Sequence, residues 1–142
     1  MDTLTPRQRS ERMSRVRGKD TAPEMRLRKL IHGMGYRYRL HVGNLPGRPD
    51  LVFSSRRKVI FLHGCFWHRH PDRNCKLARL PKSRQEFWLP KLEGNKARDH
   101  KVLAELRAGG WDVLVIWECE MNRTEWLQET IRNFLDRERR KQ

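Results

Sequence analysis

Two residues capable of acid–base or metal chemistry mark the ends of two short apolar segments. Asp50 begins the first segment and His63 ends the second, and a polar turn separates the two. This pattern predicts a β-hairpin, in which antiparallel pairing places Asp50 roughly opposite Phe61. Leu62 and His63 then lie at the same end. A carboxylate beside a backbone carbonyl offers the oxygen ligands that magnesium prefers, and a nearby imidazole can transfer protons. The hairpin is therefore a candidate site for metal-assisted hydrolysis, although turn chemistry or a strand end explains either residue taken alone.

The three cysteines and one histidine have the spacing of a metal site. Cys65, His70 and Cys75 are separated by four residues each, and Cys119 follows a predicted strand that could run beside the hairpin. Zinc takes such ligands tetrahedrally, and four protein ligands leave no open position for chemistry. We therefore predict a structural zinc that holds the aperiodic segment 64–82. The alternative is three buried free thiols and a surface histidine, the usual case for scattered cysteines.

Aromatic residues in the same segment suggest contact with nucleic-acid bases. Phe66 and Trp67 are consecutive in a polar loop, where both cannot easily face one core, so we expect at least one to be exposed. An exposed ring can stack on a base. Trp111 and Trp117 fall in a predicted strand, and we interpret them as core residues.

The charge of the chain favours a polyanionic partner. Lys and Arg number 32 against 17 acidic residues, a net charge of +15 in 142 residues. Five tryptophans argue for a folded chain, and we expect a single domain over 1–142. The sequence has no apolar stretch of membrane-spanning length and no signal-peptide pattern, so we expect an intracellular, cytoplasmic protein without a membrane partner. An odd number of cysteines argues against a disulfide framework.

The elements that must position these residues alternate between helices and strands. A capping-box pattern, Thr21-x-x-Glu24, begins one amphipathic helix, and a cap at Ser83 begins a long helix that we expect to restart at Pro90. An arm with a predicted helix from Thr5 to Gly18 precedes them. The expected order is a basic arm 1–19, helix 21–33, strand 36–40, hairpin 50–63, loop 64–82, helix 83–107, strand 111–117 and helix 124–135. This order indicates an α/β fold with a mixed sheet flanked by helices.

The motifs resemble those of one family, the very short patch repair endonucleases, over nearly the whole chain. They are Asp20-Thr21, Glu24, Gly47-Arg48-Pro49-Asp50, Phe61-Leu62-His63-Gly64-Cys65-Phe66-Trp67-His68, Glu86-Phe87-Trp88-Leu89, Arg98-Asp99 and Trp117-Glu118-Cys119. The resemblance implies the restriction-endonuclease-like fold. It also implies cleavage on the 5′ side of the mispaired T in a T:G mismatch, which arises when 5-methylcytosine deaminates.

The resemblance also implies roles for residues of the hairpin. Asp50 and the backbone carbonyl of Leu62 would bind magnesium, and His63 and His68 would be the catalytic histidines, with their division of roles left open. Many relatives have Thr where this chain has Leu62, a change that keeps the carbonyl. Asp99 would orient His68.

Other positions carry over with alternatives. Glu24 matches an active-site glutamate of the family, although its capping-box position explains it equally well. The family pattern assigns His70 rather than His68 to zinc. The gap between His70 and Cys75 is longer here than in the family, through the insertion-like residues 71–74.

Contacts to DNA are implied at the aromatics and the arm. Phe66, Trp67 and Trp88 match residues that the family inserts into the base stack. Insertion unstacks a base pair, and a wobble T:G pair costs the least free energy to unstack. The arm resembles one that clamps the minor groove, where its cations bind phosphates. The candidate contacts in the arm are Arg12, Met13, Arg15 and Val16.

Two other functions fit the same features. A non-catalytic, zinc-dependent DNA-binding module would explain the charge, the Cys/His cluster and the aromatics. A restriction-type nuclease would instead cut both strands of paired DNA, because a fold does not fix a substrate. For the mismatch endonuclease we expect a monomer, since a mismatch lacks the symmetry that favours dimers, and mismatch-repair proteins as possible partners.

Overall fold

The computed structural model describes residues 20–138. The predicted helix in the arm and the candidate DNA contacts Arg12, Met13, Arg15 and Val16 lie outside the described residues. No helix within residues 20–138 is long and apolar enough to cross a membrane.

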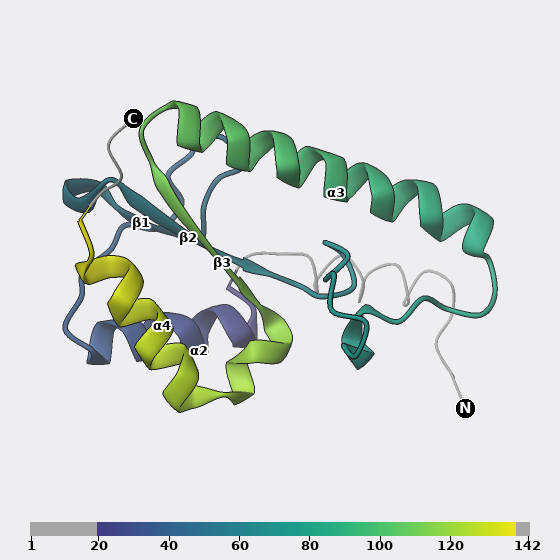
Figure 1. Ribbon diagram of the computed structural model, residues 1–142, viewed down its shortest axis with the longest axis horizontal. Coiled ribbons are helices and arrows are strands. Elements are labelled where there is room, and N and C mark those ends of the chain that lie inside the picture. Colours follow the sequence, from purple (N-terminus) through teal and green to yellow (C-terminus); the bar gives the residue numbers. More distant parts are fainter. Residues whose placement is uncertain (1–19, 139–142) are drawn as a thin grey trace.

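A mixed three-stranded sheet forms the centre of the fold (Figure 1). Its strands, in the spatial order β1-β2-β3, are β1 (Leu51–Phe53), β2 (Lys58–His63) and β3 (Asp112–Trp117). The predicted hairpin is confirmed, because β1 pairs antiparallel to β2 with Leu51 opposite Ile60. β3 pairs parallel to β2, with His63 opposite Trp117. The carboxyl ends of β2 and β3 therefore meet at one edge of the sheet.

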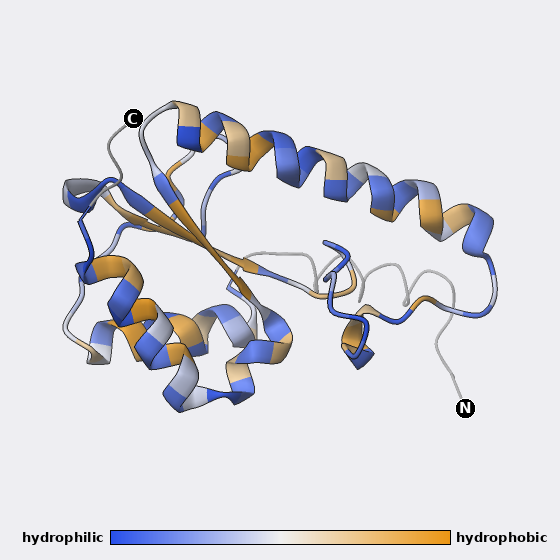
Figure 2. Ribbon diagram, viewed as in Figure 1, coloured by the Kyte–Doolittle hydropathy of each residue, from blue (hydrophilic) through white to orange (hydrophobic). Residues whose placement is uncertain are grey.

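Helices cover both faces of this sheet (Figure 1). α2 (Ala22–Gly33) and α4 (Thr124–Asp136) pack on one face, and α3 (Gln85–Ala108) crosses the other. Alternate strand residues face the two layers of helices, so the middle parts of the strands are apolar in Figure 2. One core cluster includes Leu51, Ile60 and Ile131, and the other is Val52, Val59, Phe61 and Leu106.

The predicted strand 36–40 is wrong. Only Arg39 makes a bridge, exchanging both backbone hydrogen bonds with Val52 of β1. The backbone turns sharply on either side of this segment, with positive φ angles of 99° at Gly35 and 56° at His41. Residues in the left-handed region interrupt a β-ladder, so the segment pairs with β1 at Arg39 alone. The alternation of polar and apolar residues therefore does not correspond to a strand here.

The long helix begins differently from the prediction. Arg84, in the left-handed region, occupies the N-cap of α3, and no side chain caps the helix, so the predicted Ser83 cap is wrong. The helix also continues through Pro90 instead of restarting there. Pro90 lies in the second turn, where it removes one backbone hydrogen bond. The predicted stop is confirmed, with Gly109 as the C-cap.

Two long-range contacts hold the sheet edge in place. Gly47, in the motif before Asp50, has a φ of 71° and packs directly against Val102 of α3, where a Cβ would overlap the valine side chain. At the amino end of the central strand β2, the buried Lys58 donates hydrogen bonds to the carbonyls of Phe134 and Leu135, 2.6 and 3.2 Å away, at the end of α4. Burial lowers the pKa of Lys58. Nothing in the sequence singled out this lysine.

Candidate active site and cysteine–histidine cluster

Asp50 lies beside the end of β2. Its Oδ2 accepts a hydrogen bond of 2.7 Å from the backbone N–H of Leu62. The N–H and C=O groups of one strand residue point toward the same side of the strand, so the Leu62 carbonyl lies on the same side of β2 as Asp50. The residue pair therefore presents two hard oxygen donors at the sheet edge, a donor set that suits magnesium.

The surroundings of Asp50 oppose its ionisation. Burial raises the pKa of Asp50 to about 6, the hydrogen bond from Leu62 acts against this, and the nearby charge of Glu24 raises the pKa further. A carboxylate kept in a desolvated position near another carboxylate destabilises the fold unless a cation joins it. Such a perturbed group at a sheet edge is characteristic of functional sites.

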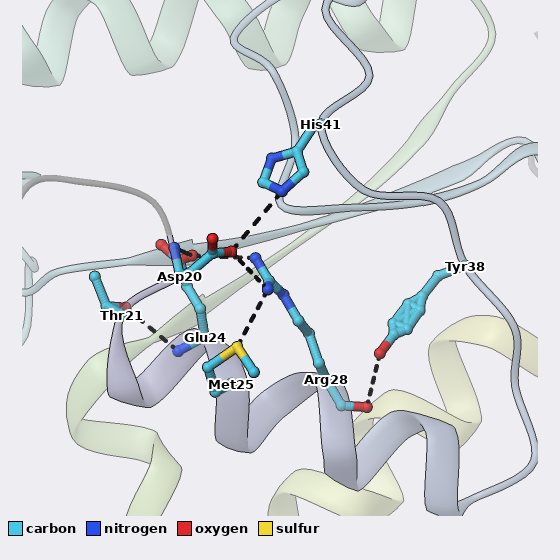
Figure 3. A network of polar contacts seen from close by, with 7 residues as sticks. All are labelled: Asp20, Thr21, Glu24, Met25, Arg28, Tyr38 and His41. Atoms are coloured by element: carbon cyan, nitrogen blue, oxygen red, sulfur yellow. Dashed lines mark hydrogen bonds and ion pairs between the residues drawn. The ribbon is translucent and has the colours of Figure 1, made fainter.

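Glu24 belongs to a polar network at the start of α2 (Figure 3). Thr21 is the N-cap, and its Oγ1 accepts from the Glu24 N–H at 3.4 Å. The Glu24 carboxylate returns to the N–H of Asp20, at 2.8 Å, instead of to the N-cap residue. Arg28 lies 3.4 Å from Glu24 Oε2 and 2.7 Å from Asp20 Oδ1, which joins the two carboxylates. The charges of Glu24 and Arg28 act in opposite directions on the pKa of Asp50. Thr21 thus caps the helix, and Glu24 holds the residue before the cap and lies within electrostatic range of Asp50.

Two histidines and an aspartate form a second group at the same edge. The rings of His63 and His68 are stacked, with centroids 4.0 Å apart. Nδ1 of His68 lies 2.6 Å from Oδ2 of Asp99, which α3 contributes. Burial, followed by the charge of His68, lowers the pKa of His63 to about 4. The three residues line a cavity of about 310 Å³, in which His63 is buried and His68 and Asp99 are half-buried.

The three cysteines and His70 converge as the spacing predicted. One ligand atom from each of Cys65, His70, Cys75 and Cys119 lies within 4.8 Å of the others. The backbone N–H of Cys119 donates to Cys65 Sγ at 3.4 Å, and Cys119 Sγ lies 3.5 Å from His70 Nδ1. The thiols are free, and burial raises the pKa of both Cys65 and Cys119. Three soft donors and an imidazole in this arrangement fit a tetrahedral zinc, which would stabilise the thiolates. His68 belongs to the other group.

Trp117 lies between the two groups, whereas the sequence predicted it to be a core residue. Its ring stacks on His70, with centroids 4.4 Å apart, and meets His63 edge-on at 5.2 Å. The side chain is half-buried. The parallel register with β2 was the missing information, because it brings the end of β3 beside His63. Trp111 is also half-buried, with the Arg57 guanidinium 4.3 Å from its ring centroid.

The candidate DNA-contacting aromatics form one cluster beside the start of α3. Phe66 lies 5.1 Å from Trp67 and 5.3 Å from Trp88, measured between ring centroids. All three are half-buried, so the expectation that Phe66 or Trp67 is exposed is wrong, and the neighbouring Phe87 is 46% exposed instead. Lys91 lies 5.8 Å from the centroid of Trp67. Neither Phe87 nor Lys91 was predicted to contact DNA, although Phe87 is adjacent to Trp88 in the motif Glu86-Phe87-Trp88-Leu89.

Comparisons with known proteins show relatives over most of the chain. A family model described as DNA mismatch endonuclease Vsr matches residues 1–76. The chain is 50% identical over 135 residues to a type II nicking enzyme, V.XorIIP, of Xanthomonas oryzae pv. oryzae, covering 95% of this chain and 97% of the relative. It is 44% identical to the DNA mismatch endonuclease Vsr of Escherichia coli K12, over 85% of this chain and 76% of that protein.

A solved structure shares the fold. The catalytic domain of the homing endonuclease I-Bth0305I superposes with a TM-score of 0.54 and 19% sequence identity, covering 81% of this chain and 94% of that domain. At this identity the likeness concerns the fold alone. It supports the α/β arrangement of a small mixed sheet flanked by helices.

Proposed function

Because the chain belongs to the Vsr family of DNA mismatch endonucleases, we propose that it nicks duplex DNA on the 5′ side of the T in a T:G mismatch. The observation that carries the proposal is the convergence of Asp50, His63, His68 and Asp99 at one sheet edge, beside the aromatic cluster. This arrangement places hydrolytic groups next to rings that can enter a base stack. The net charge of +15 favours the duplex as a ligand.

The proposed cleavage depends on magnesium. The Asp50 carboxylate and the Leu62 carbonyl would hold the ion, and Glu24 lies near enough to contribute through its charge. A bound magnesium would supply Lewis-acid stabilisation of the phosphate that is cut. Arg28 fixes the Glu24 carboxylate, so that the cap of α2 and the metal position depend on one network.

His68 and His63 are the proposed proton-transfer groups. Asp99 holds His68 through Nδ1, which orients the ring and leaves Nε2 for proton transfer. His63 stacks on this ring, so the positions of the two imidazoles are interdependent. Cys65, His70, Cys75 and Cys119 would hold a structural zinc next to them.

Replacing Asp99 with asparagine is expected to lower the cleavage rate at saturating DNA by about 10²-fold. Asparagine keeps the size of the side chain but removes the charge that fixes and supports the His68 ring. Duplex binding, which does not need this pair, should be retained. Single-turnover cleavage measures the rate, and fluorescence anisotropy measures the affinity. Glu105→Gln, an exposed change on the same helix, is the matched control. Equal cleavage by Asp99→Asn and by the control would remove Asp99 from the mechanism.

Mismatch recognition falls to Phe66, Trp67 and Trp88 in this proposal. Their rings meet in tilted and edge-to-face contacts, and Lys91 lies 5.8 Å from the centroid of Trp67. Insertion between bases unstacks a pair, which costs least at a wobble pair. The arm 1–19, outside the described residues, would clamp the duplex through its cations.

The deciding experiment uses a labelled duplex with a single T:G mismatch, its fully paired counterpart, and magnesium. The proposal expects a nick on the 5′ side of the mispaired T in the first duplex and an intact second duplex on a denaturing gel. Binding without cleavage, across flanking sequences and divalent metals, would point to the zinc-dependent binding module. Cleavage of both strands of paired DNA would point to the restriction-type nuclease.

A further inference from the structure

A basic cavity lies between the segment 69–79 and α3, and the proposed zinc ligands His70 and Cys75 form part of its lining. It has a volume of about 600 Å³. Its lining contains Asp72 and five cationic side chains, and these cations are Arg69, Arg73, Lys76, Arg79 and Lys96. Four of the five come from the loop that carries His70 and Cys75, and Lys96 comes from the facing helix. We call this feature the basic cavity.

The basic cavity adjoins the cavity of the catalytic histidines. Arg69, Pro71 and Lys96 line both. A polyanionic strand whose phosphate reaches His63 and His68 can therefore continue past these residues into the basic cavity. Successive phosphates on one strand are spaced regularly, so a strand bound at one cavity must place another phosphate nearby.

The positive charge of the basic cavity exceeds what the surrounding structure neutralises. Asp72 is engaged in its own turn, since its Oδ1 accepts from the Asn74 N–H at 2.9 Å. Arg69 lies 3.8 Å from Glu93 Oε1 and donates to the Ala78 carbonyl at 3.3 Å, which fixes the loop on α3. A zinc with three thiolate ligands would carry one net negative charge. The cations of the cavity still outnumber these acidic groups.

We propose that the basic cavity binds a phosphate of the DNA backbone close to the one that is cut. The inference rests on the proposed function and adds a role for the cysteine–histidine cluster, which positions a phosphate-binding loop. Arg73 and Arg79 can form paired hydrogen bonds to phosphate oxygens, as guanidinium groups do. Lys96 closes the cavity from the helix side. The residues 71–74, insertion-like relative to the family, thereby serve DNA binding.

The test measures the salt dependence of duplex affinity, without magnesium so that no cleavage occurs. The variant Arg73→Gln/Arg79→Gln removes two cations of the basic cavity. The control Lys29→Gln/Arg132→Gln removes two exposed cations from α2 and α4, on the opposite face of the sheet (Figure 1). Each phosphate contact contributes about 0.9 to the slope of log affinity against log salt. The slope is therefore expected to fall by about 1 to 2 in the cavity variant and to stay unchanged in the control. Zinc content, measured on both variants, checks that the loop is intact.

A third variant guards against damage to the loop. Lys96→Gln leaves the loop unchanged, removes a cation that lines both cavities, and is expected to lower the slope by about 0.9. Unchanged slopes for both cavity variants, or an equal decrease in the control, would overturn the inference. The readout is independent of cleavage. If the wild-type protein binds duplex but never nicks it, the proposed function is refuted. The slope of log affinity against log salt would still test whether the basic cavity binds phosphate. Wild-type protein that nicks mismatched DNA, with cavity variants that bind as it does, would refute this inference alone.

Discussion

Replacing Asp50 with asparagine is expected to lower the rate of strand cleavage by on the order of 10³-fold or more while the protein stays folded. Asparagine matches the shape of aspartate and can still accept the hydrogen bond from the Leu62 N–H. It lacks the negative charge that would hold magnesium. The same change relieves the burial of a carboxylate and its repulsion with Glu24, the two effects that raise the pKa of Asp50. The melting temperature should therefore be unchanged or higher as activity is lost.

Three measurements separate these effects. Single-turnover cleavage of a T:G duplex gives the rate, anisotropy without magnesium gives the affinity, and a thermal melt gives the stability. Glu129→Gln, an exposed change on α4, is the control for loss of one negative charge. Cleavage by Asp50→Asn within about tenfold of wild type, a difference of about 1.4 kcal/mol in the barrier, would rule out Asp50 as the metal ligand.

Replacing Cys75 with serine is expected to release the structural metal and loosen the loop 64–82. A structural zinc contributes its binding free energy to the folding of the segment that it joins. The loop is rich in exposed and polar residues, and its described part has only the short 3-10 turn Lys76–Ala78 as regular structure. A loss of several kcal/mol corresponds to a decrease in melting temperature on the order of 10 °C. Because Trp117 contacts both His70 and His63, cleavage should decrease as well.

Metal analysis and hydrogen exchange test this prediction. Wild-type protein should contain about one zinc per chain and Cys75→Ser almost none. A chelator added to the wild type should reproduce the lower melting temperature. Exchange should accelerate in the loop, whereas the buried strands β1 and β2 stay protected. Ser83→Ala, an exposed change near the end of the loop, is the control. A wild-type protein that neither contains zinc nor gains stability from it would contradict the prediction.

The local elements could be read from the sequence because they depend on near neighbours. The hairpin follows from two apolar segments with a polar turn, and the structure reproduces its register. α4 follows from apolar residues at helical spacing, and Leu127, Ile131, Phe134 and Leu135 are buried as that spacing requires. The errors arose where tertiary contacts overrode local preference. The segment 36–40 only bridges Val52 at the sheet edge, and α3 continues through Pro90.

The sequence by itself also supplied the chemical types of the candidate site. It placed Asp50 and His63 at matching ends of a hairpin, and it spaced Cys65, His70 and Cys75 along one loop. These inferences need only the geometry of a strand pair and the ligand preferences of metals.

Only the tertiary structure decided which distant groups join these residues. The parallel pairing of β3 with β2 carries Cys119 to Cys65 and Trp117 to the histidines, and the packing of α3 across the sheet brings Asp99 to His68. The start of α2 brings Glu24 and Arg28 within electrostatic range of Asp50. Such contacts depend on which apolar faces pack together, and this packing is a property of the whole core that no local pattern encodes.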